Sequence, residues 1–251
     1  VKLEHLVTEV IAKQIDNGFG FDLDQALSLE KDLMIEKACI EDEMRTIFPD
    51  ITHIRHSDKT GKRLKDKIEV FNPGSRKQIG ERLVNKYKWQ PPLTDKGNYH
   101  IDSDVLSSLD FPEARELCKY FDTTKLISQV SDWVIRASSS RDGKIHGSIN
   151  PQGTVTGRMT ASQPNLQQVS GDPRARALFK PRDGWVQVGI DASGLEARIL
   201  ASRMAEFDGG AYADEILTGD IHTKNQEVAG LETRDQTKTF FYGFIYGAGN
   251  K

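Results

Sequence analysis

The chain has 251 residues, of which 37% are hydrophobic and 28% charged, and its formal net charge at pH 7 is −3. This composition excludes a disordered chain, and no apolar run approaches the length of a membrane span, so we expect a globular protein of one large or two smaller domains. The two cysteines, Cys39 and Cys118, do not have the spacing of a metal site or a disulfide framework, which favours a reducing compartment. No stretch resembles a secretory signal peptide.

The charges are distributed unevenly over the first hundred residues. Residues 1–50 contain 5 basic and 12 acidic side chains, whereas residues 51–100 contain 12 basic and 5 acidic ones. The basic segment favours an anionic partner, although two solvated faces that compensate each other would give the same pattern.

The first part of the chain is predicted to be mostly helical. Apolar residues recur at helical spacing over residues 3–17, and a second long helix is expected after Phe21 to Asp24, ending near Ile47. Residues 49–69 predict a surface loop or hairpin that carries basic residues. Further helices are expected at residues 103–109, 112–121 and 124–133.

A capping box predicts the helix between these segments. Ser75 to Gln78 reads Ser-Arg-Lys-Gln, so a helix should begin at Arg76, with Ile79, Leu83 and Tyr87 along its buried side. A helix start that combines a cap hydroxyl with basic side chains suits a phosphate backbone. The basic side chains expected to project outward are Arg76, Lys77, Arg82, Lys86 and Lys88.

Residues 145–150 and 153–160 alternate in a way that predicts a hairpin, and the sequence Gln-Pro-Asn-Leu-Gln follows it. Arg158, Asn165 and Gln167 in this region could donate hydrogen bonds to base edges and sugars in a minor groove without choosing a sequence. The Thr-Gly-Arg of the hairpin is a weak signal alone, because any hairpin can contain it. Thr-Gly-Arg followed seven residues after its Arg by Asn-Leu-Gln, and then by the segment that ends at Asp191, is a much more specific signal.

The segment from Trp185 to Ile190 alternates apolar and polar residues, which predicts a strand with one buried face. The strand should end at Asp191, followed by a turn and a helix over residues 195–204. A carboxylate at a strand tip before a helix suits a metal ion or polar ligand. Asp191 could equally be a simple cap of the next helix, so both interpretations stay open at this point.

Two short helices are expected next, over residues 211–217 and from Ile221 to near Gly230, the second capped by Asp220. His222 lies in the first turn of the second helix, where a core-facing or capping role is the usual one.

A second capping box, Thr233 to Gln236, opens a helix with a stripe of chemically distinct side chains. Arg234, Lys238, Tyr242 and Tyr246 recur at intervals of four, and each step advances about 40°, giving a slowly turning stripe roughly 18 Å long. Two cations followed by two aromatic rings match a nucleoside triphosphate. A salt-bridging turn followed by buried aromatic residues would give the same spacing.

Taken in order, these motifs resemble those of the family A DNA polymerases, which include bacterial polymerase I, and the resemblance is closest to replicative polymerases of short-tailed phages. It spans essentially the whole chain. The matching text is F-N-P-G-S-R-K-Q at 71–78, D-G-K-I-H-G-S-I-N-P-Q-G-T-V-T-G-R at 142–158, P-N-L-Q at 164–167, G-I-D-A-S-G-L-E-A-R at 189–198, D-I-H-T-K-N at 220–225 and R-D-Q-T-K-T-F-F-Y-G-F-I-Y-G-A-G at 234–249.

The resemblance implies a truncated α+β fold of right-hand polymerase architecture. A mostly helical thumb would occupy residues 1–130, the first part of an incomplete antiparallel palm sheet residues 131–204, and the start of the helical fingers residues 205–251.

The resemblance also implies roles for individual residues. Asp191 would bind the catalytic metals with help from the Ala192 carbonyl, two Mg²⁺ ions being expected in the complete enzyme, and Lys238 would act with Asp191 in catalysis by meeting charge on the leaving pyrophosphate. Glu196 would pack against the sugar and exclude a 2′-hydroxyl. The expected nucleotide-binding residues are Glu196, His222, Arg234, Lys238 and Tyr242. The expected DNA-binding residues are Ser75, Arg76, Lys77, Arg158, Asn165, Gln167, Arg198 and Tyr246.

The sequence departs from the family pattern in two respects. The second palm carboxylate of the family lies in a His-Asp-Glu motif, and no such tripeptide occurs here, so we expect this chain alone not to extend primers. Residues 48–70 are too few for a thumb module that recruits thioredoxin, so thioredoxin binding is not expected. The expected partners are primer-template DNA, dNTP and the remainder of the polymerase chain, in the cytoplasm of an infected bacterial host and without membrane attachment.

Two other interpretations remain. A single-subunit RNA polymerase relative would share the palm and fingers plan, but Glu196 argues against it, because an RNA polymerase must leave room for the 2′-hydroxyl. A catalytically dead DNA-binding remnant would have little reason to retain Asp191, Arg234, Lys238 and Tyr242 together.

Overall fold

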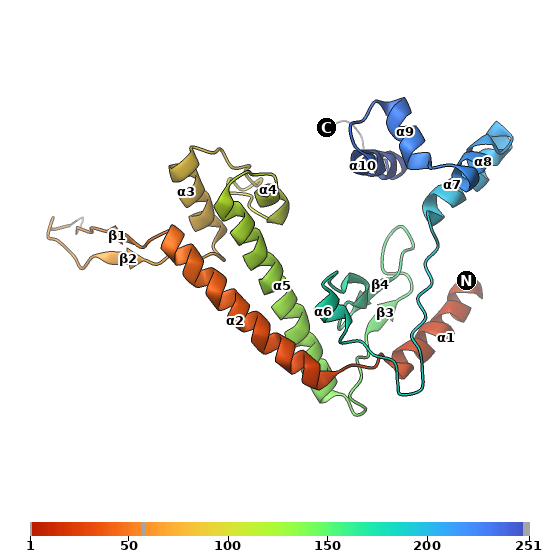
Figure 1. The fold of residues 1–251 in the computed structure, drawn as a ribbon, viewed down its shortest axis with the longest axis horizontal. Coiled ribbons are helices and arrows are strands. Elements are labelled where there is room, and N and C mark those ends of the chain that lie inside the picture. The colour runs from red at the N-terminus through yellow and green to blue at the C-terminus, as the bar shows by residue number, and fades with distance from the viewer. Residues whose placement is uncertain (1, 57–58, 248–251) are drawn as a thin grey trace. The chain divides into compact units, whose positions relative to one another are not determined.

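The computed structural model describes residues 2–56 and 59–247 (Figure 1). The chain divides into two compact units, Val1–Gln187 and Val188–Lys251. Among the described residues, every helix is too short or too polar to span a lipid bilayer.

Helices and two small antiparallel sheets make up the fold, as the α+β expectation requires. The elements of the first unit are α1 (Lys2–Asn17), α2 (Leu23–Ile47), β1 (Ile51–His53), β2 (Lys67–Glu69), α3 (Arg76–Tyr87), α4 (Ser103–Ser107), α5 (Pro112–Ser139), β3 (Ser148–Asn150), β4 (Thr160–Ser162), η1 (Leu166–Gln168) and α6 (Pro173–Arg176). Those of the second unit are α7 (Leu195–Asp208), α8 (Ala211–Thr218), α9 (Ile221–Ala229) and α10 (Arg234–Ile245).

The long helices α2 and α5 pack along each other and carry the core of the first unit (Figure 1). Apolar residues on one face of α2 are buried because they recur near the helical period. One core cluster lies where Met44 of α2 meets α3, α4 and the start of α5. A second cluster lies where Leu29 of α2 meets Trp133 of α5 and Leu178.

The two helices predicted at residues 112–121 and 124–133 are one continuous helix, α5. The residues between them, Asp122 and Thr123, contain neither glycine nor proline, and Thr123 is buried within the helix. Packing against α2 therefore outweighs the modest helix propensity of these two residues.

The surface loop or hairpin predicted at residues 49–69 is a hairpin, and the hairpin predicted from residue 145 onward also forms. β1 pairs with β2 in the register Thr52↔Ile68, and β3 pairs with β4 in the register Ile149↔Ala161. The second hairpin differs from the prediction, since β3 covers only the last three residues of the first predicted strand and β4 overlaps the predicted 153–160 strand at Thr160 alone. A cis peptide bond joins Gln163 to Pro164 directly after it.

The predicted strand before Asp191 is wrong in this structure. The segment from Trp185 to Ile190 belongs to neither sheet, and Val186, Val188 and Ile190 are 82%, 74% and 94% exposed. A strand needs a neighbour for its backbone hydrogen bonds, and none of the strands among the described residues pairs with this segment. The alternating pattern thus has no partner to bury it.

Two of the domain boundaries predicted from the resemblance fall inside helices of the structure. The thumb-to-palm boundary at residue 130 falls inside α5, and the palm-to-fingers boundary at residue 204 falls inside α7. These two boundaries stay predictions.

Candidate nucleotide and DNA-binding site

Asp191 does not cap the helix that follows it. The N-cap of α7 is Gly194, which has φ 59° and ψ 34° and makes no side-chain cap hydrogen bond. The Asp191 side chain is exposed and has no hydrogen-bond or ion-pair partner among the described residues. The capping interpretation is therefore wrong, and the carboxylate is available to a ligand.

The residues around Asp191 fit part of a site for a hard cation. A Mg²⁺ ion prefers oxygen ligands in octahedral geometry, and the Asp191 carboxylate and the Ala192 carbonyl are ligands of that kind. The part of the chain that the structure describes contains no group of three or more His, Cys, Asp or Glu side chains that could hold a metal ion. A metal ion at Asp191 would therefore need ligands beyond these two.

Arg198 stabilises the turn next to Asp191. Its Nε donates a hydrogen bond of 2.8 Å to the Ser193 carbonyl oxygen, and its backbone N–H donates to Gly194. Arg198 thus acts within the turn between Asp191 and α7, whereas the sequence predicted a contact with DNA; that contact stays a prediction.

The structure brings together Glu196 and Tyr246, which are 50 residues apart in sequence. Glu196 lies half-buried in the first turn of α7, and Tyr246 is the C-cap of α10. The phenol Oη of Tyr246 donates a hydrogen bond to Oε1 of Glu196. This contact joins the residue expected at the sugar to the end of the predicted stripe.

The stripe on α10 is positioned by a complete capping box, in which the Thr233 and Gln236 side chains each accept from the other's backbone N–H. Thr237 and Phe241 are buried and hold the helix in place. Lys238 and Tyr242 are half-buried, while Tyr246 is exposed and lies one residue beyond the helix. The ion pairs of Arg234 with Asp220 and of Lys238 with Asp235 fit the alternative interpretation of a salt-bridging turn, whereas the exposed Tyr246 does not fit its buried aromatic residues.

Asp220 connects the starts of α9 and α10. Its carboxylate accepts from the Thr223 hydroxyl at 3.0 Å and from the Arg234 guanidinium at 3.3 and 3.4 Å. Lys238 lies 3.8 Å from Asp235. The sequence predicted Asp220 as a cap but missed its ion pair with Arg234. The His222 side chain lies outside the described ones.

In the first unit, the structure groups the three residues predicted for a minor groove. The Asn165 side chain caps η1 by accepting from the Gln167 backbone N–H at 3.1 Å, and Gln167 Nε2 donates to the Met159 carbonyl at 3.4 Å. The Arg158 backbone N–H donates to the Thr154 hydroxyl at 2.9 Å. All three side chains are exposed, so the loop and hairpin are fixed together and present them to solvent.

The start of α3 forms as predicted, with one difference in its cap. Ser75 Oγ accepts from the Gln78 backbone N–H at 3.4 Å, but the Gln78 side chain accepts from Asn72 instead of Ser75. Arg76 and Lys77 are exposed and line a groove of about 730 Å³ together with residues 94–99.

Two of the basic side chains predicted to project outward from α3 are held by the protein. Lys86 pairs with the buried Glu113 of α5, and Arg82 donates to the Pro49 carbonyl at 2.9 Å. The sequence could not show this, because Pro49 and Glu113 are each more than 25 residues away from their partners.

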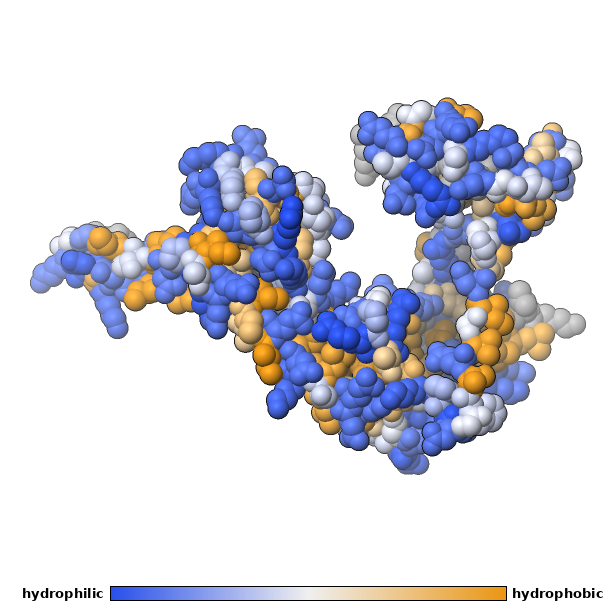
Figure 2. Space-filling model, in the orientation of Figure 1, coloured by the Kyte–Doolittle hydropathy of each residue, from blue (hydrophilic) through white to orange (hydrophobic). Residues whose placement is uncertain are grey.

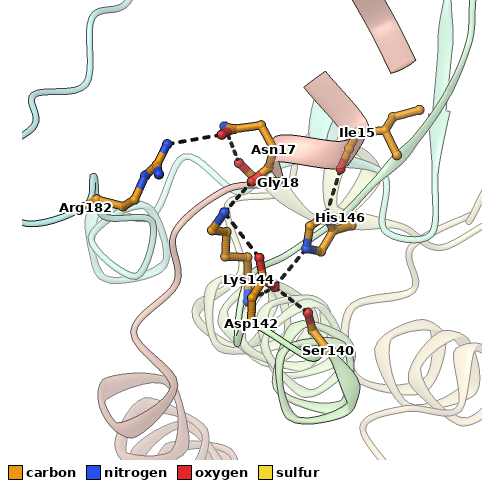
Figure 3. A network of polar contacts seen from close by, with 8 residues as sticks. All are labelled: Ile15, Asn17, Gly18, Ser140, Asp142, Lys144, His146 and Arg182. Carbon is orange, nitrogen blue, oxygen red and sulfur yellow. Dashed lines mark hydrogen bonds and ion pairs between the residues drawn. The ribbon is translucent and has the colours of Figure 1, made fainter. Parts of the chain in front are cut away.

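A polar network ties the end of α1 to the start of the β3–β4 hairpin (Figure 3). His146 Nδ1 lies 2.7 Å from the Ile15 carbonyl oxygen, and its Nε2 lies 3.0 Å from Asp142 Oδ1. Lys144 Nζ donates to the Asn17 carbonyl at 2.7 Å. The Asp142 carboxylate, and next the Ile15 carbonyl, raise the pKa of His146, and the same contact with His146 lowers the pKa of Asp142.

Comparison with known proteins first defines the fold. The chain is similar to the solved structure titled POL domain of Pol1 from M. smegmatis in complex with DNA primer-template and dNTP, with a TM-score of 0.69 and 22% identity over 96% of this chain and 41% of that one. The two share a polymerase-domain fold.

Sequence comparison then defines the family. Residues 52–251 match the model described as DNA polymerase family A, and the chain therefore belongs to this family. It is 48% identical over 206 residues to the DNA-directed DNA polymerases of Enterobacteria phage T3 and Escherichia phage T7. Each alignment covers 72% of this chain and 29% of the phage protein, so the chain spans less than a third of these relatives.

Proposed function

We propose that this chain takes part in template-directed DNA synthesis, as the thumb, the first part of the palm and the start of the fingers of a phage-type DNA polymerase in its bacterial host. It binds primer-template DNA and dNTP, and together with the remainder of the polymerase it transfers a nucleotide from dNTP to the primer 3′-hydroxyl. Membership of DNA polymerase family A supports the reaction. The contact between Glu196 and Tyr246 carries the proposal, because it joins the Asp191–α7 segment to the α10 stripe within one compact unit.

Asp191 and the Ala192 carbonyl would hold Mg²⁺, two ions being expected in the complete site. When bound, the metal neutralises charge on the reacting phosphate oxygens. Arg234 and Lys238 bind the triphosphate as cations, and Lys238 also meets the charge that develops on the leaving pyrophosphate. His222 adds a further contact to the phosphates.

The remaining residues select and orient the reactants. The Tyr242 ring stacks near the incoming sugar and base, and Glu196 packs against the sugar. The hydrogen bond from Tyr246 limits the positions that the Glu196 carboxylate can adopt, which supports discrimination against a 2′-hydroxyl and hence a deoxynucleotide substrate. Tyr246 itself holds the template-side position, and Arg198 is a further DNA-binding residue.

DNA is held by the first unit in two places. Arg158, Asn165 and Gln167 contact the minor groove near the primer end without choosing a sequence. Ser75, Arg76 and Lys77 bind the phosphate backbone at the start of α3, where N–H groups and basic side chains coincide.

The substitution Asp191→Ala tests the proposal in the polymerase that contains this chain and the remaining palm and fingers. Primer extension should fall by about 1,000-fold, equivalent to about 4 kcal/mol of lost transition-state stabilisation, while affinity for primer-template stays the same. The control Asp183→Ala removes another exposed carboxylate and should leave extension unchanged.

Equal effects of the two substitutions would refute the role of Asp191. The chain of 251 residues by itself should bind primer-template without extending it. Metal-dependent extension by the chain alone, abolished by Asp191→Ala, would show that no second palm carboxylate is required.

A further inference from the structure

The Asp220 carboxylate lies at the start of α9 and is held there by the first turn of that helix. Its Oδ2 accepts from the Thr223 hydroxyl at 3.0 Å, and its Oδ1 accepts from the Thr223 backbone N–H at 3.5 Å. The Asp220 backbone carbonyl accepts from the Lys224 N–H at 3.1 Å. Because a capping residue is fixed through both its backbone and its side chain, Asp220 is an anion in a defined position.

The Arg234 side chain reaches the same carboxylate from the start of α10. Its Nε lies 3.3 Å from Asp220 Oδ2 and its Nη2 lies 3.4 Å from Oδ1, so the carboxylate engages one edge of the guanidinium with both oxygens. Among the described residues, Nη1 at the other edge makes no hydrogen bond. A guanidinium is planar and its donors form a rigid fork, so fixing one edge sets the direction of the other.

The connection between the two helices is fixed as well. Gln226 Nε2 on α9 donates to the Glu232 carbonyl at 3.0 Å, and the Leu231 N–H donates to the Gln226 carbonyl at 3.1 Å. The capping box of Thr233 then begins α10. The ion pair between Asp220 and Arg234 therefore closes a corner whose backbone is already held by other hydrogen bonds.

This corner joins the residues expected at the triphosphate on both helices. His222 follows Asp220 by two residues on α9, whereas Arg234 and Lys238 belong to α10. Helix starts favour anions, because their N–H groups and the helix dipole carry partial positive charge. Figure 2 shows mainly hydrophilic residues over α9 and α10, as a hydrated polyanion requires.

Asp220 has two opposite effects on an anion that approaches Arg234. Its negative charge competes for the guanidinium, but the two side chains are 48% and 49% exposed, so water screens this competition. Its hydrogen bonds hold a long side chain in one orientation, and a side chain that is already ordered loses less entropy when it binds phosphate. The gain from orientation therefore outweighs the loss from competition.

We propose that Asp220 is a positioning residue for the incoming nucleotide, which holds the Nε–Nη2 edge of Arg234 so that Nη1 meets the triphosphate. This inference rests on the proposed function, in which Arg234 binds the triphosphate. It adds a residue that acts through Arg234 and does not itself touch the nucleotide.

The test measures kcat and KM for dNTP at saturating primer-template, in the active polymerase that contains this chain. Asp220→Asn keeps a side chain that caps helices well but has one acceptor oxygen instead of two. The matched control is Asp208→Asn. Asp208 fixes the turn before α8 by accepting from the backbone N–H groups of Gly210 and Tyr212 at 2.9 and 3.0 Å, without a cationic partner among the described residues.

In Asp220→Asn, KM for dNTP should rise about five- to tenfold while kcat stays within about twofold, because a contact that serves substrate and transition state alike is weakened. Inhibition by inorganic triphosphate, which has no sugar or base, should weaken by the same factor. Asp208→Asn should leave KM and kcat unchanged.

A double-mutant cycle separates positioning of Arg234 from capping of α9. Arg234→Lys replaces the fork with an ammonium group that one edge contact cannot orient. When Asp220→Asn is added to Arg234→Lys, KM should therefore rise by less than about twofold.

A lower KM in Asp220→Asn would overturn the proposal, because it would show that Asp220 competes with the triphosphate for Arg234. An equal rise with and without Arg234→Lys would also overturn it, since Asp220 would then act through the α9 cap alone. Unchanged KM in both single variants would refute the triphosphate role of Arg234 in the proposed function as well. A rise with Arg234→Lys but not with Asp220→Asn would overturn this inference only.

Discussion

Glu113 is a buried carboxylate that fixes α3 to α5, and replacing it with glutamine tests how α3 is held. Its side chain is only 6% exposed, and both oxygens are engaged. Oε1 accepts from Lys86 Nζ, and Oε2 accepts from the Tyr87 hydroxyl at 2.6 Å. The Tyr87 ring also stacks on Phe111 with centroids 4.0 Å apart, so these contacts orient the helix whose start presents Ser75.

Glu113→Gln keeps the shape of the side chain and one hydrogen bond to Tyr87, but it removes the negative charge that faces Lys86. A hydrogen bond to a charged group contributes about 1.5–3 kcal/mol. Because the Lys86 side chain is 45% exposed and can turn toward water, we expect the lower part of this range, a loss of about 1.5 kcal/mol in the free energy of unfolding at pH 7.

The loss should depend on pH. Burial alone would raise the pKa of Glu113, but hydrogen bonds from Lys86 and Tyr87 outweigh it and lower the pKa below the ordinary 4.5. A carboxyl group with a lowered folded-state pKa contributes stability above its unfolded pKa and loses it as the pH falls. The difference between the unmodified chain and the variant should therefore be full at neutral pH and shrink below about pH 4.5.

Urea unfolding followed by circular dichroism at several pH values measures the effect. The matched control is Glu116→Gln on the same helix, where the carboxylate pairs with Lys119 three residues away at the surface, and the expected loss is below about 0.5 kcal/mol. Equal losses in the two variants, or a loss for Glu113→Gln that does not change with pH, would refute this reasoning.

Two further predictions concern the polar network and the sugar contact. Because Asp142 raises the pKa of His146 above 6.5, the contribution of His146 to the free energy of unfolding is complete below pH 6.5 and is lost as the pH rises through the raised value. In the variant His146→Gln, the urea midpoint should therefore decrease less between pH 6.5 and higher pH than in the unmodified chain. An equal decrease in both proteins would show that the contact with Asp142 does not stabilise the fold. Tyr246→Phe should lower the preference for dNTP over rNTP, measured as a ratio of kcat/KM in the active polymerase, by about three- to tenfold, because Glu196 loses the donor that orients it. An unaltered ratio would mean that Glu196 needs no such support.

Local sequence determined most of the helices and the family. The helices that begin at Arg76 and Arg234 follow from capping residues a few positions apart, and α1 follows from its apolar periodicity. These signals work because caps and amphipathic faces are encoded within one or two turns. The order of the motifs around Asp191 was likewise enough to predict membership of DNA polymerase family A, and the family match confirms this prediction.

Only the tertiary structure decided which partners those local elements meet. Lys86 pairs with Glu113 and Glu196 accepts from Tyr246, and neither contact could be predicted because the partners are 27 and 50 residues apart. In the segment before Asp191 the local pattern predicted an element that does not form. Its alternating residues are typical of a strand, but no strand of the described residues pairs with it. Alternation is a property of the segment, whereas a sheet requires hydrogen bonds from a neighbour that the segment does not contain.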